Sequence, residues 1–386
     1  MSYLNLFTSE SVGPGHPDKI CDQLSDAILD ACYKEDDNPR VAAECFITTD
    51  TVIIGGEIST KASIDYEKIV RETLLEIGYS NKEYGIDART CKIINLIKKQ
   101  SPDIALGVNN STDISSIGAG DQGMMFGYAT DETSVYMPLP IHLAHSLVKR
   151  ADELRKINQL KYARPDMKSQ VTIDYSGNVP RIHTILMSVQ HDDDYVEEEF
   201  KQNLIEKVMN YVAKENNLNT DFNIIINPTG RFVIGGPEGD TGLTGRKIIV
   251  DTYGGSAHHG GGAFSGKDCT KVDRSAAYMA RYLAKNIVAA KLAKKCEIQL
   301  AYAIGKSHPV SLHVNTFNTG AVSDEIIIKA IKDNFELTPA EIIKVLDLRR
   351  PIYKKTATFG HFGRNEEEFT WERLDLVEKF QKYLTK

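Results

Sequence analysis

The chain has 386 residues, 41% of them hydrophobic, which is enough to bury a substantial core in two or three domains or in one intertwined unit. Its formal net charge of −7 and pI near 5.9 argue against nucleic acid as the main partner, so cations that bind a ligand must be gathered locally. No apolar run is long enough to predict a membrane span, and the first residues lack the pattern of a signal peptide. We therefore expect a cytoplasmic protein without a membrane partner.

Six cysteines are scattered along the sequence without a Cys-x-x-Cys pair. This spacing favours reduced thiols and argues against both a zinc site and a disulfide framework. Cys269 alone lies in a glycine-rich segment, but no histidine at readable spacing marks it as a catalytic thiol.

The first half of the chain predicts helices and hairpins in alternation. Pro17, followed by Ile20, Leu24 and Ile28 at helical spacing, predicts a helix from residue 17. The segment 100–117 has too little apolar content to pack, so we expect a mobile loop there. Further expected elements are a hairpin over 41–58 turning near 49–50, a helix over 63–78, a strand over 92–97, a strand pair over 124–137, a helix over 141–154 and a hairpin over 169–190 turning at 176–178.

The second half continues in the same way around two glycine-rich segments, 229–247 and 254–274. An acidic run at 192–199 is expected to open a helix, because carboxylates favour a helix N-terminus. The remaining expected elements are a strand over 222–227, a helix over 275–293, strands over 297–304 and 310–317, and helices over 324–335 and 339–346. Helices and hairpins recur three times in similar order without a residue-level repeat, which favours an α+β fold over a doubly wound parallel sheet.

The segment from Gly254 to Arg274 contains six glycines, two lysines and two aspartates and leads into a helix. Glycines let backbone N–H groups approach an anion, lysines neutralise it, and carboxylates hold a divalent metal, so the segment suits a polyphosphate. From Gly261 the spacing matches Gly-x4-Gly-Lys, but Asp268 replaces the Ser or Thr of an ordinary phosphate loop. The alternative is a surface loop in which Asp273 only caps the helix.

Two other segments contain the same residue types. The sequence GHPDK at 15–19 brings a histidine and a carboxylate to a helix start, where they either cap the helix or serve phosphate and Mg²⁺. The first glycine-rich segment adds an aromatic ring, a carboxylate and two adjacent cations, namely Phe232, Asp240, Arg246 and Lys247. Glu44 and Glu57 interrupt apolar strands, where each carboxylate either meets a cation or faces solvent.

Two patterns are expected not to be sites. Residues 118–123 read Gly-x-Gly-x-x-Gly, but a strand pattern follows instead of the helix that a dinucleotide fold requires. His258 and His259 are adjacent, and neighbouring side chains on a loop seldom converge on one metal ion.

Five motifs together resemble the S-adenosylmethionine synthetase (methionine adenosyltransferase) family: GHPDK at 15–19, GAGDQG at 118–123, GGGAFSGKD at 260–268, KVDRSAAY at 271–278 and GHFGR at 360–364. The resemblance spans almost the whole chain. It implies three structurally similar α+β domains about a pseudo-threefold axis, here 1–101, 118–234 and 235–386, with a mobile loop at 102–117. It also implies a homodimer or dimer of dimers with shared active sites, ATP and L-methionine as substrates, tripolyphosphate cleaved to phosphate and pyrophosphate, and a requirement for Mg²⁺ and K⁺.

The resemblance assigns roles residue by residue. Catalysis would use His16, Asp121, Arg246, Lys247 and Lys267, and methionine would be bound by Glu57, Gln100, Asp240 and Lys271. ATP would be bound by His16, Asp166, Lys168, Arg231, Phe232, Asp240, Arg246, Lys247, Ala263 and Lys267. Asp18 and Asp273 would ligate Mg²⁺, and Glu44 would belong to the K⁺ site. Met167 departs from the family, which usually has glycine at that position.

These residues suit the implied reaction, because a thioether has no proton to lose and its attack on carbon needs no general base. What the step needs is alignment of the reacting atoms and cations for a tripolyphosphate leaving group. An ATP-dependent phosphotransferase would use the same cations for a different transfer, and a non-catalytic ATP-binding subunit would keep the fold without the chemistry. Detection of a sulfonium product separates the synthetase from both.

Overall fold

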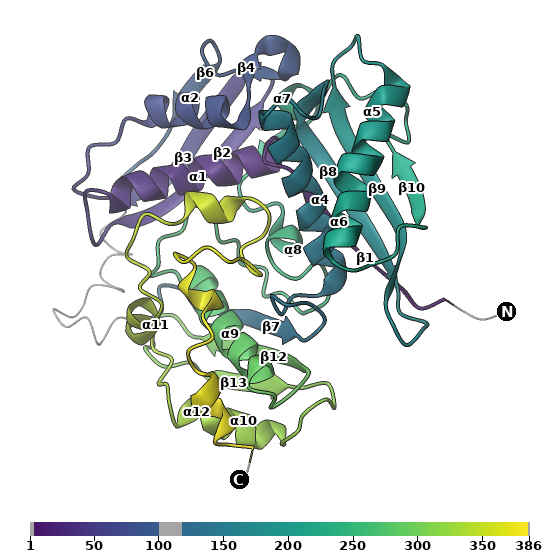
Figure 1. The fold of residues 1–386 in the computed structure, drawn as a ribbon. Helices are drawn as coiled ribbons and strands as arrows, with labels where there is room; N and C mark the ends of the chain where they lie inside the picture. The colour runs from purple at the N-terminus through teal and green to yellow at the C-terminus, as the bar shows by residue number, and fades with distance from the viewer. Residues whose placement is uncertain (1–3, 100–117, 385–386) are drawn as a thin grey trace.

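The structure is a computed structural model that describes residues 4–99 and 118–384. Figure 1 shows three groups of helices packed on sheets, which follow one another in colour from the N-terminus to the C-terminus. The mixed content confirms the predicted α+β class. In the described part of the chain, no helix is both long and apolar enough to cross a membrane.

The first group is built on a sheet with the strand order β11-β2-β3-β6. β2 (Arg40–Thr48) and β3 (Thr51–Ser59) form the predicted hairpin, β6 (Lys92–Asn95) runs parallel to β3, and β11 (Gly242–Leu243) pairs antiparallel with β2. Alternate residues of β2 are buried against helices α1 (Pro17–Tyr33) and α2 (Tyr66–Ile77). A small ribbon of β4 (Ser80–Asn81) and β5 (Ile86–Asp87) follows, around a 3₁₀ turn at Lys82–Tyr84.

The second group has its own hydrophobic core, between a sheet of order β1-β8-β9-β10 and the helices on one face of it. The strands are β1 (Leu6–Val12), β8 (Ala163–Asp174), β9 (Arg181–His191) and β10 (Asn223–Ile226). The helices are α4 (Leu139–Lys156), α5 (Glu197–Leu204) and α6 (Asn210–Glu215), and a π-helical turn at Ile205–Met209 joins the last two.

The third group packs α9 (Val272–Ala289) against a sheet of order β13-β12-β7. The strands are β7 (Gly123–Thr130), β12 (Lys295–Tyr302) and β13 (Ser311–Asn315). Around them lie α10 (Asp324–Lys332), α11 (Pro339–Val345), α12 (Val377–Gln381) and 3₁₀ turns at Lys354–Ala357 and Thr370–Glu372. Two short helices, α7 (Gly236–Gly239) and α8 (Ile248–Asp251), lie in the connection between the second and third groups.

Each of the three main sheets borrows a strand from another part of the chain. β1 precedes α1 in sequence but pairs with β8, and β11 follows the second group but completes the sheet of the first. β7 precedes the second group but pairs along its whole length with β12. The groups are therefore intertwined, and the contiguous division at residues 101, 118 and 234 remains a prediction.

Most predicted elements are present, with ends that shift by a few residues. The predicted strand pair over 124–137 is wrong: only β7 forms, and the chain turns at once, with Thr133 Oγ1 accepting a hydrogen bond from Met137 N and Tyr136 at φ 61°. The partner of β7 is a strand about 170 residues later, which local periodicity does not reveal. α9 begins at Val272 and not near Ser275, so Asp273 lies inside its first turn.

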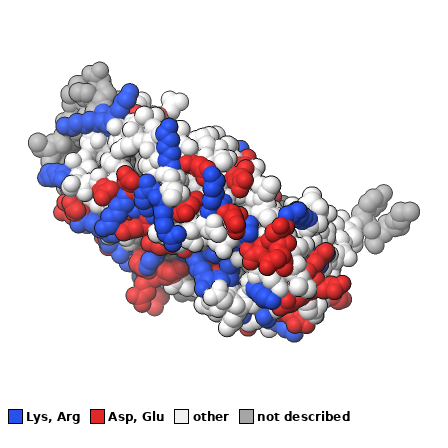
Figure 2. Space-filling model, turned by 90° about the horizontal axis from the view of Figure 1, so that it is seen from above, with Lys and Arg blue, Asp and Glu red and all other residues white. Residues whose placement is uncertain are grey.

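Charged side chains are mixed over the surface. Figure 2 shows Lys and Arg interspersed with Asp and Glu on the face seen from above, without a continuous field of one sign. Cations able to hold a ligand must therefore be sought in local clusters.

Candidate active site

Four aspartates recur at every fourth position of α1, and we call Asp18, Asp22, Asp26 and Asp30 the aspartate row. Like charges at this spacing destabilise an isolated helix, so each carboxylate needs a partner from elsewhere. Each accepts a backbone N–H from a segment more than 200 residues later in the chain. The donors, in order along the row, are Leu243, Gly245, Gly266, and Tyr353 together with Lys354. The row therefore fixes both glycine-rich segments on the first helix.

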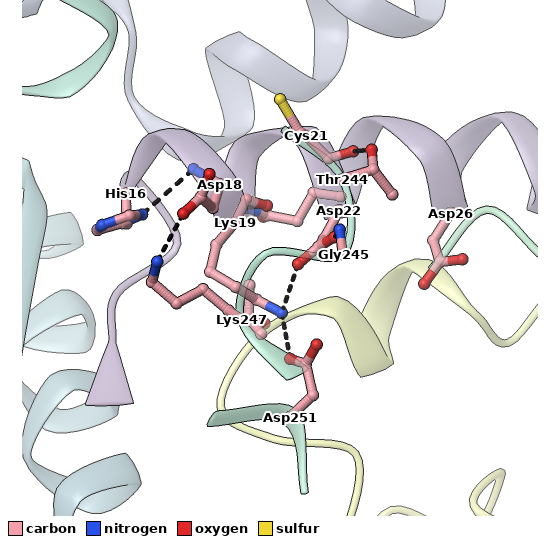
Figure 3. A network of polar contacts seen from close by, with 12 residues as sticks. His16, Asp18, Lys19, Cys21, Asp22, Asp26, Thr244, Gly245, Lys247 and Asp251 are labelled. Carbon is pink, nitrogen blue, oxygen red and sulfur yellow. Dashed lines mark hydrogen bonds and ion pairs between the residues drawn. The ribbon is translucent and has the colours of Figure 1, made fainter. Parts of the chain in front are cut away.

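At the start of α1, His16 caps the helix, whereas the carboxylate of Asp18 contacts residues outside it. His16 Nδ1 accepts the N–H of Asp18 at 3.2 Å and so caps the helix. The carboxylate of Asp18 lies 2.5 Å from Lys247 Nζ (Figure 3). It also accepts Leu243 N at 3.0 Å and lies 3.8 Å from Arg246 Nε. Burial opposes its charge, but Lys247 and Leu243 N outweigh burial and lower the pKa of Asp18.

Asp166 and Lys168 extend this cluster from β8. Asp166 is buried and accepts Gly236 N on one oxygen at 2.9 Å, while its other oxygen has no hydrogen-bond partner among the described residues. Burial raises the pKa of Asp166 to about 6. Burial, with help from Lys247 and Lys168, lowers the pKa of His16 to about 3, so the imidazole is neutral near pH 7. We call His16, Asp18, Asp166, Lys168, Arg246 and Lys247 the first group. From here on, the first and second groups are groups of site residues and not the groups of helices and strands described for the fold.

Lys267 and Asp273 form a second group together with Asp121. Lys267 Nζ lies 2.6 Å from Asp273 Oδ2, and both side chains are about one quarter exposed. A methyl group added at Gly262 would lie 2.5 Å from the Asp273 carboxylate, and one at Gly123 would lie 3.5 Å from it. The exposed Asp121 precedes Gly123 by two residues, at the entry to β7. The second group attaches to α1 at Asp26, two turns or about 12 Å beyond Asp18.

Glu44 and Glu57 lie on β2 and β3, in the sheet of order β11-β2-β3-β6. Both are exposed, as one of the two sequence readings anticipated, although Glu57 is opposite Ala42, which forms a bridge with Lys267. Glu57 therefore stands two strands from the second group. Glu44 lies opposite Gly55 on the same hairpin, and the described residues offer no group of three or more His, Cys, Asp and Glu side chains for a metal.

Of the remaining predicted site residues, some lie near the two groups and others are paired elsewhere. Asp240 is exposed and lies close enough to Asp166 to affect its pKa, and a methyl group at Gly245 would lie 2.5 Å from Ala263 Cβ. Lys271 is paired with the buried Asp268, and Arg231 is paired at the surface with Asp193. Within the described part of the chain, no hydrogen bond or ion pair joins the side chain of either cation to the two groups. Gln100 lies outside the described residues, as does the rest of the predicted loop at 100–117.

Phe232 and Met167 pack close to the first group. Phe232 is half-buried and its backbone exchanges hydrogen bonds with His191, while its ring would meet a methyl group at Gly235 at 2.8 Å. Met167 is fully buried, and its side chain occupies the space that a Cβ on Gly13 would need. Met167 therefore faces the core, between Asp166 and Lys168.

The patterns that the sequence analysis set aside make contacts of other kinds in the structure. His258 Nδ1 lies 2.8 Å from Glu297 Oε1, whereas His259 Nδ1 accepts Gly261 N, so the two rings have different partners. Burial raises the pKa of Cys269 to about 11, so its thiol stays protonated near neutral pH. The strand β7 after residues 118–123 confirms that a dinucleotide-binding helix is absent there.

Sequence reasoning missed the buried ion pairs behind the two groups. Lys19 contacts Asp22 at 2.9 Å and Asp251 at 2.5 Å (Figure 3). Arg274 makes a two-pronged contact with Asp26. Burial opposes the charge of Lys19, but the two carboxylates outweigh it and raise its pKa. The signal that would have found them is the aspartate row, because like charges at four-residue spacing predict cationic or N–H partners from elsewhere.

Cations, carboxylates and backbone N–H groups gathered at the start of a helix are typical of proteins that bind a polyphosphate with a divalent cation. Family models of S-adenosylmethionine synthetase match the chain in three parts: the N-terminal domain at residues 4–102, the central domain at 116–232 and the C-terminal domain at 234–373. The chain belongs to the S-adenosylmethionine synthetase family.

Similar proteins support this membership over nearly the full length. An S-adenosylmethionine synthase of Mesoplasma florum is 63% identical over 378 residues, which cover 98% of this chain and 99% of the relative. An S-adenosylmethionine synthase of Mycoplasma capricolum is 60% identical over 379 residues, covering 98% and 97%.

Proposed function

We propose that the chain is a methionine adenosyltransferase that joins ATP and L-methionine into S-adenosylmethionine. The sulfur of methionine attacks C5′ of ATP, the C5′–O bond breaks, and tripolyphosphate leaves with the bonding electrons. Water then splits tripolyphosphate into phosphate and pyrophosphate. The observation that carries the proposal is the cluster of Arg246, Lys247 and Lys168 around the neutral His16 at a helix start, within a chain of this family.

The first group would bind the triphosphate. Arg246 and Lys247 offer positive charge, and a neutral His16 donates a hydrogen bond to the departing oxygen without adding a charge of its own. Phe232 would stack on adenine, with Asp166, Lys168 and Arg231 around the nucleotide. Because Asp166 is buried with one oxygen unpaired, it has an acceptor ready for a ligand donor.

The second group would complete the site at the reacting carbon. Lys267 and Ala263 would contact the nucleotide, and the carboxylate of Asp121 would stabilise the positive charge that develops on sulfur. Glu57, Gln100, Asp240 and Lys271 would bind methionine. No side chain is needed as a base, so these residues act by alignment, which is worth roughly 7–11 kcal/mol in favourable cases.

Mg²⁺ fits the site through Asp18 and Asp273, because each presents a carboxylate beside a lysine that phosphate oxygens would also contact. Magnesium usually takes one or two carboxylates together with substrate phosphates and water, so no cage made only of protein is required. When bound, the ion would neutralise charge on the tripolyphosphate. For K⁺ the chain offers Glu44, an exposed carboxylate on β2.

We further propose that two copies of the chain share each active site, as a homodimer or a dimer of dimers. In support, the segments that carry the two groups bond to α1 at Asp18 and Asp26, about 12 Å apart along the helix, and both Glu44 and Asp121 are exposed on one copy. Mixing His16→Ala with Lys267→Ala protein tests this, because exchanged subunits would rebuild one intact site per pair. Activity that stays at the level of either variant alone would contradict a shared site.

The decisive experiment incubates the purified chain with ATP and methionine, with and without Mg²⁺ and K⁺, and identifies the products. S-adenosylmethionine, phosphate and pyrophosphate are expected, with activity lost when either ion is withheld. ADP formation with a phosphorylated acceptor would instead indicate a phosphotransferase, and ATP binding without any product would indicate a regulatory subunit.

A further inference from the structure

We propose that Asp22 is a positioning residue for the loop that carries Arg246 and Lys247, and that it sets the affinity for the triphosphate of ATP without contacting it. This inference rests on the proposed function of Arg246 and Lys247. Asp22 is fully buried in the second turn of α1 and belongs to none of the family motifs that mark the site.

Asp22 connects the loop to a buried charge. Its Oδ1 accepts Gly245 N at 2.8 Å, and its Oδ2 lies 2.9 Å from Lys19 Nζ (Figure 3). Gly245 has φ 77°, a left-handed conformation that favours glycine and turns the chain directly before Arg246. The hydrogen bond that Gly245 N donates to Asp22 therefore holds the backbone turn that directly precedes the two cations.

Lys19 is connected through Asp251 to the C-terminal end of the same loop, at Lys247. Its ammonium lies 2.5 Å from Asp251 Oδ1, and Asp251 N donates to the carbonyl of Lys247 at 2.8 Å. The path from Gly245 through Asp22, Lys19 and Asp251 back to Lys247 is thus a closed ring of contacts around the loop. All three ionisable side chains of the ring are at most 3% exposed, so water does not substitute for a lost member.

An aspartate is required at position 22 because one oxygen accepts the Gly245 N–H and the other is ion-paired with the Lys19 ammonium. An asparagine has one oxygen and one amide NH₂, so it satisfies either Gly245 N or Lys19 Nζ but never both. An alanine satisfies neither. The affinity for the triphosphate should therefore fall in the order wild type, Asp22→Asn, Asp22→Ala.

Glu372 provides a control in the 3₁₀ turn at Thr370–Glu372, outside the loop that carries Arg246 and Lys247. It is also buried, with one oxygen accepting Gly363 N at 2.8 Å and the other 2.7 Å from Lys285 Nζ. Each oxygen also lies 3.0 Å from a guanidinium nitrogen of Arg281, so Glu372→Gln disturbs at least as many buried contacts as Asp22→Asn. It should lower the melting temperature at least as much as Asp22→Asn and leave the affinity for ATP unchanged.

The test measures the dissociation constant of the imido analogue of ATP by calorimetry, the KM for methionine, and the melting temperature of each variant. We expect the dissociation constant to rise about threefold in Asp22→Asn and about tenfold in Asp22→Ala, as one or two buried hydrogen bonds are lost. The KM for methionine should stay within about twofold of the wild-type value, because the loop cations are assigned to the triphosphate.

Three results would overturn the inference: an unchanged dissociation constant in folded Asp22→Asn, an equal rise in Glu372→Gln, or an equal rise in the KM for methionine. If Asp22→Ala does not fold, Asp22→Asn decides alone, because it also loses one contact. Failure of the proposed function is recognised separately, since it appears as wild-type protein that makes no S-adenosylmethionine.

Discussion

The ammonium of Lys267 lies 2.6 Å from the carboxylate of Asp273, six residues later and inside the first turn of α9. The pair closes the glycine-rich loop on itself, while the backbone next to Lys267 is held independently, with Ala43 N donating to Gly266 O at 3.0 Å. Because backbone contacts fix the loop, the lysine side chain is available for a ligand.

Lys267→Ala should therefore lower S-adenosylmethionine formation by at least about a hundredfold, the usual cost of removing one preorganised charge contact. The melting temperature should change little, since the loop keeps its backbone hydrogen bonds. Steady-state turnover and thermal melting check this, with Lys294→Ala, an exposed lysine after α9, as the control. Wild-type turnover in the Lys267 variant would remove this lysine from the site.

Asp18→Asn and Asp273→Asn should melt near wild type but lose activity, with partial recovery at high Mg²⁺. Asparagine still accepts a backbone N–H such as that of Leu243, but it lacks the charge that magnesium prefers. The matched control is Asp65→Asn, because Asp65 caps α2 by accepting Lys68 N at 3.0 Å and has no assigned ligand. Activity and Mg²⁺ dependence equal to wild type in both site variants would leave the aspartates as structural groups only.

Phe232→Ala should raise the KM for ATP at least about fivefold, because stacking of a base on an aromatic ring contributes on the order of 1–3 kcal/mol. The ring is half-buried, so the melting temperature should fall only modestly. Phe222→Ala, which removes a buried ring ten residues earlier, should do the reverse. A large thermal loss with an unchanged response to ATP would show that Phe232 serves the core.

His145 predicts a pH dependence of stability. Burial lowers its pKa to about 3, against about 6.5 in an unfolded chain, so the folded state binds fewer protons between these values. The stability from this group is fully present above about pH 6.5 and is lost as the pH falls towards 3. His145→Gln should flatten the dependence of unfolding free energy on pH by up to about 1.4 kcal/mol per unit between pH 6 and 4.

Denaturant titrations at several pH values measure this slope. His308→Gln changes an exposed histidine and is the control, with a slope expected to match wild type. Equal slopes in all three proteins would mean that His145 does not set the acid limit of stability.

Local patterns predicted α1 and both long hairpins, because Pro17, the spacing of apolar residues and the turn at residues 176–178 are all signals within a short window. They did not predict that β7 pairs with β12, or that two residues at 242–243 complete a sheet, since pairing between distant segments leaves no local period. The site residues likewise fall into those that the sequence predicted and those that only the structure reveals. Residues that the sequence assigned to the site, such as Asp18 and Lys247, are brought together, whereas Asp22 and Asp251 were assigned no role and only the folded chain shows their contacts.

The borrowed strands also set the order in which a growing chain can fold. β1 leaves the ribosome first, but its partner β8 is complete only at Asp174, on the order of ten seconds later at ordinary rates of synthesis. β2 awaits β11 at Gly242, and β7 has no neighbour until β12 begins at Lys295. A chain released before Lys295 therefore leaves open strand edges, the kind of surface that pairs with other chains and aggregates.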